Sequence, residues 1–97
     1  KQAVCLYHAL IKAKELIEQK GVSIVVKIKQ AMKKIIAKNS FAKIDYIEFV
    51  HPVTLESIKT IKEKVVVALA VYIGKTRLID NMVFTLLRRK PLCSEKS

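Results

Sequence analysis

The chain has 97 residues, of which 19 are Lys or Arg and eight are Asp or Glu, giving a formal net charge of +11 at pH 7. That length suits one domain rather than two, and a hydrophobic share of 52% excludes a disordered basic tail. The longest uncharged apolar run, Val65–Gly74, has ten residues, whereas a membrane-spanning helix needs about 20. Two cysteines, Cys5 and Cys93, lie at opposite ends of the chain. They fit free thiols in a reducing compartment better than a disulfide or a zinc site.

The positive charge permits one functional interpretation, a stand-alone basic module that binds RNA or an acidic partner. Sixteen of the 19 basic residues are Lys, whereas bidentate contacts to phosphate and guanine favour Arg. The chain also holds 12 Ile, and joint enrichment in Lys and Ile is what an AT-rich genome produces without selection for binding. A solvated lysine-rich surface is the simpler explanation, so we expect no specific nucleic-acid binding.

Two amphipathic helices are predicted in the first 40 residues. Over Gln2–Lys20, apolar residues recur at three- and four-residue steps, and Gly21 is placed to end the helix in a left-handed conformation. A second helix is predicted from Ser23, whose hydroxyl can cap the first turn, to Asn39-Ser40. Its β-branched start also allows a strand, but a 3.6-residue period that continues for three further turns favours a helix.

Three strands are predicted in the second half of the chain. Lys43–Val50 is rich in β-branched and aromatic residues. Val65–Tyr72 is continuous in apolar residues, which predicts a central strand covered on both faces, or nearly so. After a turn at Gly74-Lys75, Thr76–Asp80 reads as its antiparallel partner.

Between the first two strands, His51-Pro52 ends strand pairing, and a short turn or helix follows over residues 54–60, with Thr54 as a possible cap. The fold class is therefore α+β, with two N-terminal helices packed on a small, mainly antiparallel sheet of about three strands. We expect the domain to span residues 1–85. The polar, basic residues at the end, 86–97, are expected to form a flexible tail, frayed over Arg88–Ser97.

The residues give no catalytic constellation and no metal site. His8 and His51 are not spaced as a metal pair, and a lone histidine is more often a surface or core residue than a ligand. Asp45 and Glu48 are three residues apart, so on a regular strand they point to opposite faces and cannot share one site. We therefore assign no catalytic residue and no metal ligand.

The most unusual local sequence is Gly74–Asn81, which places two cations, an acid and an amide beside a buried strand. The simpler interpretation is a hairpin in which Arg77 and Asp80 pair with each other or with neighbours. The functional interpretation is an anion-facing edge, with Lys75 and Arg77 near a phosphate. The residues alone favour the simpler interpretation.

The order of segments resembles the C-terminal domain of the pantothenate synthetase (pantoate–beta-alanine ligase) family, over about residues 3–83. The resemblance rests on five stretches in order: Leu6–Leu10, Ile44–Glu48, Thr54-Leu55, Ala68–Val71 and Gly74–Asn81. The Asp-Tyr strand and the Gly-x-Thr-Arg-Leu-Ile-Asp-Asn stretch are the specific parts. From about residue 86 onward the chain has no counterpart in the family.

The resemblance implies a parent enzyme that joins pantoate to beta-alanine with ATP and Mg²⁺ through a pantoyl-adenylate, a cytoplasmic step toward coenzyme A. In that family a larger N-terminal nucleotide-binding domain carries a His-x-Gly-His motif, a Ser-Ser-Arg-Asn loop binds the ATP phosphates, and the parent is expected to be a homodimer. Neither motif occurs in this chain. The C-terminal domain resembles a hinged lid that excludes water from the site.

The resemblance therefore predicts the lid domain of a ligase, inactive alone, whose partner is the N-terminal domain of the same enzyme. Lys75 and Arg77 are candidate cations that face the nucleotide on the closed lid, and no cofactor is expected to bind this domain tightly. Besides the basic module above, one further alternative remains: self-association through apolar surface that the N-terminal domain would otherwise cover.

Overall fold

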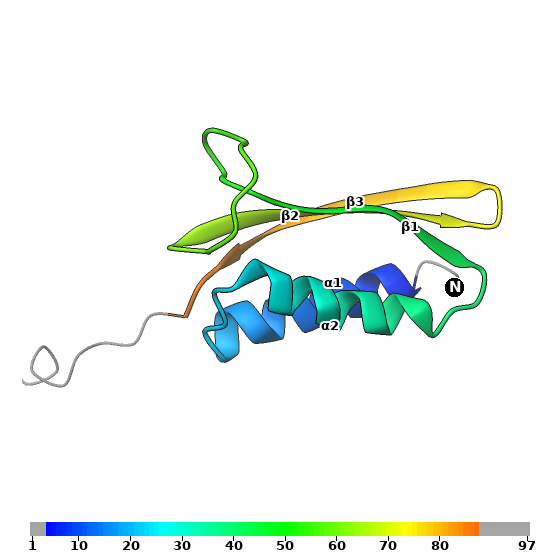
Figure 1. Cartoon of the computed structure of the whole chain (residues 1–97), viewed down its shortest axis with the longest axis horizontal. Helices are drawn as coiled ribbons and strands as arrows, with labels where there is room; N and C mark the ends of the chain where they lie inside the picture. The colour runs from blue at the N-terminus through cyan, green and yellow to red at the C-terminus, as the bar shows by residue number, and fades with distance from the viewer. Residues whose placement is uncertain (1–3, 88–97) are drawn as a thin grey trace, which may run out of the picture.

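The computed structural model describes residues 4–87. The elements, in chain order, are α1 (Val4–Lys14), the π-helical turn η1 (Glu15–Gln19), α2 (Val25–Ala37), β1 (Ala42–Val50), β2 (Lys64–Ile73) and β3 (Thr76–Thr85). The strands form one antiparallel sheet in the order β1-β2-β3, and both helices lie on one side of it (Figure 1). The α+β prediction is confirmed. The predicted frayed tail, residues 88–97, lies outside the described residues.

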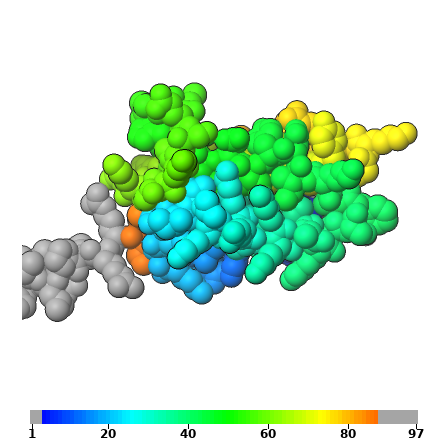
Figure 2. All heavy atoms as spheres, in the orientation of Figure 1, coloured from blue at the N-terminus to red at the C-terminus, as the bar shows by residue number. Residues whose placement is uncertain are grey.

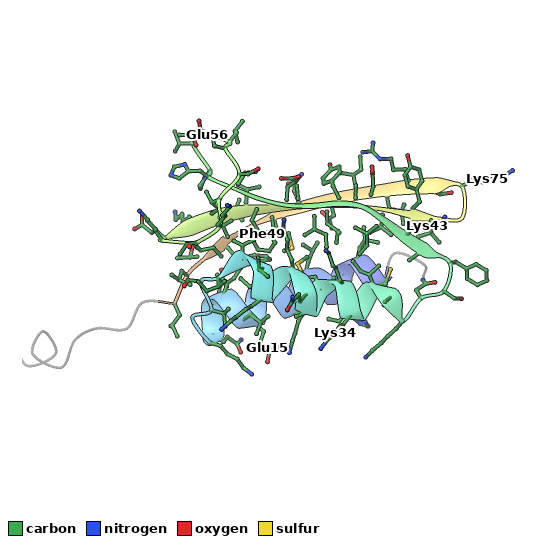
Figure 3. The ribbon with its side chains drawn as sticks, viewed as in Figure 1. Glu15, Lys34, Lys43, Phe49, Glu56 and Lys75 are labelled. Carbon is green, nitrogen blue, oxygen red and sulfur yellow. The ribbon has the colours of Figure 1, made fainter. Side chains whose placement is uncertain are left out.

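The core lies between the two helices and the helix-facing side of the sheet. Helices α1 and α2 each contribute the apolar residues of one side, spaced three or four positions apart. Strand β2 contributes every second residue. The largest side chains of this core with under 2% exposure are Leu10, Ile17, Ile28, Met32, Ile36, Phe49, Ile61, Leu69 and Phe84. Figure 3 shows Phe49 pointing from the sheet toward the helices. Among the described residues, none of the helices is both long and apolar enough to cross a membrane.

The first predicted helix is regular only as far as Lys14. The helix then continues as the wider π-helical turn η1, in which the Lys20 N–H donates to the Glu15 carbonyl at 3.1 Å. Gly21 follows with φ +69°, the left-handed conformation predicted from the sequence. The turn is tied to the end of β3, because the Leu87 N–H donates to the Ile17 carbonyl at 2.9 Å. Hydrogen-bonded structure therefore reaches two residues into the segment predicted as a tail.

The second helix begins two residues later than predicted, and Ser23 does not cap it. The residue before the first turn is Ile24, which makes no side-chain cap hydrogen bond. The Ser23 carbonyl accepts from the Ile61 N–H at 2.8 Å, and the Lys59 carbonyl accepts from the Val25 N–H at 3.0 Å. The Lys59 carbonyl therefore satisfies a first-turn N–H group, that of Val25, which a serine cap would otherwise serve.

The segment predicted as a short turn or helix over 54–60 is an irregular loop. Leu55 has φ +63°, which a right-handed helix does not allow. Ser57 instead forms an isolated bridge with Val50, and the Ile58 N–H donates to the Phe49 carbonyl at 2.9 Å. Thr54 caps no helix, although its hydroxyl oxygen accepts from the Glu56 N–H at 3.3 Å.

Strand β1 carries an irregularity in its pairing that changes which face its side chains occupy. Ile44 is aligned with Val71 and Tyr46 with Ala70, so Asp45 is an extra residue on β1. Such a bulge shifts the alternation of side chains by one position. The prediction that Asp45 and Glu48 point to opposite faces is therefore wrong: both lie on the face that the helices leave open.

The central strand β2 is covered by the helices on one face only. Its core-facing residues Val65, Val67 and Leu69 have 0% exposure, whereas Tyr72 on the other face is 40% exposed. Figure 1 shows no described element lying across that second face. The prediction of cover on both faces is wrong for the described part of the chain, and one face of the sheet remains open.

Candidate functional site

The feature of the molecule that the fold does not use is the face of the sheet opposite the helices, which we call the open sheet face. Strand register assigns its members as Lys43, Tyr46, Glu48 and Val50 of β1, Lys64, Val66, Ala68, Ala70 and Tyr72 of β2, and Arg77, Ile79, Asn81, Val83 and Thr85 of β3, with Asp45 at the bulge. Ile79 is 55% exposed and Val83 is 59% exposed. The face is therefore mixed, with exposed apolar side chains standing among charged and polar ones.

An ion pair with an aromatic neighbour lies on the open sheet face near the β2–β3 hairpin. The Arg77 guanidinium donates to one Asp45 carboxylate oxygen, from Nη2 at 2.9 Å and from Nε at 3.0 Å. The Arg77 guanidinium carbon also lies 5.8 Å from the centre of the Tyr46 ring, within the range of a cation–π contact. The bulge at Asp45 places this carboxylate beside β3, so Arg77 has a fixed direction.

The two predicted nucleotide-facing cations differ in how they are held. Gly74-Lys75 forms the hairpin turn, in which Gly74 has φ +61° and Ile73 is aligned with Thr76. Figure 3 shows Lys75 extending beyond the end of the hairpin, away from the sheet. Arg77 instead lies flat on the open sheet face against Asp45. The hairpin brings the two residues to one end of the sheet, with Lys75 exposed and Arg77 paired.

A loop over residues 51–57, the apical loop, rises beside the open sheet face (Figure 1) and forms a knob on the surface (Figure 2). The His51 Nδ1 accepts two backbone hydrogen bonds, from Val53 at 3.0 Å and from Thr54 at 3.3 Å. The Ser57 hydroxyl donates to Glu48 at 3.2 Å. Val53 is 81% exposed and Leu55 is 68% exposed, so the loop presents two apolar side chains on a hydrogen-bonded frame.

Two further hollows are found on the part of the surface formed by residues 4–87. One of about 650 Å³ sits at the base of the apical loop, between His51 and the start of β2 at Lys64. The other, of about 540 Å³, lies on the helices and is lined by Lys12, Lys27, Gln30, Ala31, Lys34, Ile35 and Lys38. The second hollow has four lysines and no acidic residue in its lining, so it is a basic surface.

The remaining candidate residues do not come together as a reaction centre. His8 is exposed on α1, where its ring lies 6.1 Å from that of Tyr7. Cys5 is half-buried against the core, and Cys93 lies outside the described residues. Within residues 4–87, no group of three or more His, Cys, Asp or Glu side chains could hold a metal ion.

The expectation that Arg77 pairs with Asp80 or with a neighbour holds in its second form, because its partner is Asp45, which the sequence did not identify. The frame of the apical loop was not foreseen. The pair joins residues 32 positions apart, and it depends on a bulge that no local pattern marks. The His51-Pro52 dipeptide predicted the end of the strand, but nothing in it indicated that the imidazole would hold the following backbone. Strand register is the signal that would have found the pair.

Comparisons with known proteins agree on one family. The chain matches the family model described as pantoate-beta-alanine ligase over residues 1–83. It is 54% identical over 83 residues to the pantothenate synthetase of Caldicellulosiruptor bescii, a match that covers 86% of this chain and 29% of that protein. It is 55% identical over 82 residues to the pantothenate synthetase of Thermosipho melanesiensis, covering 84% and 29%.

The fold is also found in a solved structure of the same kind. The pantothenate synthetase of Thermus thermophilus superimposes with a TM-score of 0.70 at 27% sequence identity, over 80% of this chain and 28% of that one. The chain thus spans less than a third of the length of the curated relatives it matches. Because the family model covers most of its residues and a solved relative shares its fold, the chain belongs to the pantoate-beta-alanine ligase family.

Proposed function

We propose that this chain is the C-terminal lid domain of an enzyme that condenses pantoate and beta-alanine with ATP to give pantothenate. One observation carries the proposal: the chain matches the ligase family over residues 1–83 while covering only 29% of a full-length relative. The same proposal places the enzyme in the cytoplasm, at a step toward coenzyme A. It makes the parent a homodimer and makes the N-terminal nucleotide-binding domain the main partner of this chain.

In this proposal the reacting groups lie outside the described residues. The described part of the chain contains no candidate metal cluster, and the whole chain contains neither of the phosphate-binding motifs that the family resemblance leads one to expect. The residues here therefore do not fit a Mg²⁺ site, and we assign no step through the metal to them. The role of this domain is to cover the active site of the other domain. When the lid is closed, it excludes water, which would otherwise hydrolyse an acyl-adenylate.

Lys75 and Arg77 are the proposed contribution of this domain to nucleotide binding. Both stand at the hairpin end of the sheet, and neither is buried in the core. Lys75 is free to reach toward phosphate oxygens, since it extends beyond the hairpin (Figure 3). Arg77 can add positive charge in a fixed position, because Asp45 and Tyr46 hold its guanidinium.

The proposal is tested with two proteins: the 97-residue chain, and a chimera in which it replaces the matching region of the Caldicellulosiruptor bescii pantothenate synthetase. With pantoate, beta-alanine, ATP and Mg²⁺ present, the chimera forms pantothenate and the chain alone forms none. Turnover by the purified chain would show that the reacting groups are here after all. A correctly folded chimera that forms no pantothenate would contradict the assignment to this enzyme.

A second property is favoured by the basic hollow on the helices, a weak and sequence-independent attraction of polyanions. Lys27, Lys34 and Lys38 line it from α2 and its C-terminal end, and Lys12 lines it from α1. Of these, only Lys12 takes part in an ion pair among those found in residues 4–87, with Glu15 at 3.4 Å. The positive field of such a surface attracts phosphates generally but distinguishes no sequence.

A further inference from the structure

The basic hollow on the helices is lined by a straight row of lysines on α2. Lys27, Lys34 and Lys38 follow one another at steps of seven and four residues, which return a helical side chain to nearly the same side. At a rise of about 1.5 Å per residue, the row extends over about 16 Å. Lys12 lines the same hollow from α1. Four ammonium groups are therefore gathered on one surface.

The row is a charge arrangement that the folding of α2 does not need. Lys34 and Lys38 are four residues apart, a spacing at which like charges destabilise a helix. Lys27 lies in the first turn, where the helix dipole disfavours a cation, and neither that turn nor the rest of α2 holds an acidic residue. All three lysines are exposed. Exposed residues that weaken a helix without improving its packing indicate a function.

Carboxylates leave most of the charge in the hollow uncompensated. Among the ion pairs of residues 4–87, Lys12 pairs with Glu15 at 3.4 Å, and Glu15 is shared with Lys20 at 4.0 Å. The three lysines of the row take part in none of them. Figure 3 shows Lys34 pointing away from the sheet, so the row and the Arg77 site on the open sheet face are separate. The row is therefore available to an anion from solution.

The shape and chemistry of the hollow favour a ligand with several phosphate groups. A lysine ammonium contacts phosphate as a point charge on a flexible stem, without the fixed fork of arginine. Cations spread over about 16 Å exceed what one phosphate or one carboxylate can contact. The volume of about 540 Å³ lies within the usual range of small-molecule sites, about 300–1,000 Å³. A polyphosphate chain, free or carried by a nucleotide, fits these features.

We infer that the basic hollow is a discrete site for a polyphosphate anion. This inference rests on the second property proposed above, since it assigns that general attraction to particular residues, and it is independent of the ligase assignment. The competing explanation is the positive field of a chain with a net charge of +11. A field depends on how many charges the chain carries, whereas a site depends on where they lie.

Calorimetric titration of the 97-residue chain with inorganic tripolyphosphate at low salt tests the inference. Lys27→Gln/Lys34→Gln removes two charges from the hollow. The matched control, Lys43→Gln/Lys64→Gln, removes two exposed charges from the open sheet face, so both variants have the same net charge. We expect one tripolyphosphate per chain. The hollow variant should bind roughly tenfold more weakly because two charge contacts are lost, and the control should change by less than about twofold.

Equal losses of affinity in the two double variants would overturn the discrete site and leave only the general attraction. Absence of tripolyphosphate binding by the unmodified chain would overturn both. Pantothenate formation by the chimera is unaffected by either result, so failure of the ligase assignment is detected separately. ATP without Mg²⁺, titrated in parallel, distinguishes the two sources of phosphate. Equal affinities support a free polyphosphate chain, and tighter binding of ATP supports a nucleotide.

Urea unfolding without ligand checks that the variants report binding rather than folding. The hollow variant should be at least as stable as the unmodified chain, because it loses a cation from the first turn of α2 and the repulsion between Lys34 and Lys38. A clear loss of stability would overturn the claim that folding does not need the row. Lys38→Gln, which leaves the first turn unchanged, should also weaken tripolyphosphate binding severalfold. Unchanged affinity in that variant would contradict the site.

Discussion

At the residue scale, His51 shows how one exposed side chain can fix a loop. Its Nδ1 is the acceptor for the Val53 and Thr54 N–H groups. We expect His51→Ala to lower the free energy of unfolding by about 1 kcal/mol, since a hydrogen bond contributes about 0.5–1.5 kcal/mol net and these two are solvent-exposed. Urea titration measures the change. His8→Ala, at an exposed helix position, is the control and should change stability by less than about 0.5 kcal/mol; equal losses in the two variants would deny the loop role of His51.

A second residue-scale prediction concerns Lys75. In the chimera, Lys75→Ala should raise the KM for ATP roughly fivefold, because a cation about 4 Å from a phosphate contributes about 1 kcal/mol in water. Lys59→Ala is the control, since Lys59 lies in the irregular segment between β1 and β2 and is also exposed. Steady-state kinetics at saturating pantoate and beta-alanine separates the two variants. Identical KM values for ATP would remove Lys75 from the nucleotide-facing set.

At the element scale, α2 is stabilised by its buried stripe rather than by its caps. Ile28 has 0% exposure, whereas Val26 on the same helix is 55% exposed. Ile28→Ala should destabilise the domain by about 2–5 kcal/mol, through lost burial and the cavity left behind. Val26→Ala should stay within about 0.5 kcal/mol. Thermal or urea unfolding of the two variants gives the comparison, and a small loss for Ile28→Ala would mean that α2 is only loosely packed.

The existence of both α-helices and all three strands could be predicted from the sequence, the helices from their periodicity and the strands from composition or a continuous apolar run. The apolar stripe that includes Ile28, Met32 and Ile36 defines α2 without reference to any other segment. The start of that helix could not be predicted, because its first N–H group, that of Val25, donates to the carbonyl of Lys59, which is distant in sequence. The face occupied by Asp45 could not be predicted either, since the bulge exists only in the pairing of β1 with β2.

The candidate site could be predicted only in part for the same reason. The local stretch around Gly74 is enough to single out Lys75 and Arg77 and to predict the hairpin turn that joins their strands. The open sheet face could not be predicted, because the apolar run of β2 indicates that both of its faces should be covered but not which element covers each. Within residues 4–87 the helices cover one face, and the second face became visible only in the structure.

At the scale of the whole molecule, the net charge of +11 is a property of the surface. The chain should bind unrelated RNAs of equal length with equal, weak affinity, because its lysines attract phosphate without reading bases. Filter binding at two salt concentrations measures this. We expect affinity to fall steeply with salt for every RNA, and a marked preference for one sequence would support the stand-alone binding module instead.

The account as a whole depends on this chain completing an enzyme whose reacting groups lie elsewhere. The most direct test compares the initial rate of pantothenate formation by the chimera with that of the Caldicellulosiruptor bescii enzyme truncated before the matched region. We predict that the chimera is faster by a factor on the order of 100, because loss of the lid admits water and loosens the bound substrates. Equal rates for the two proteins would contradict the account.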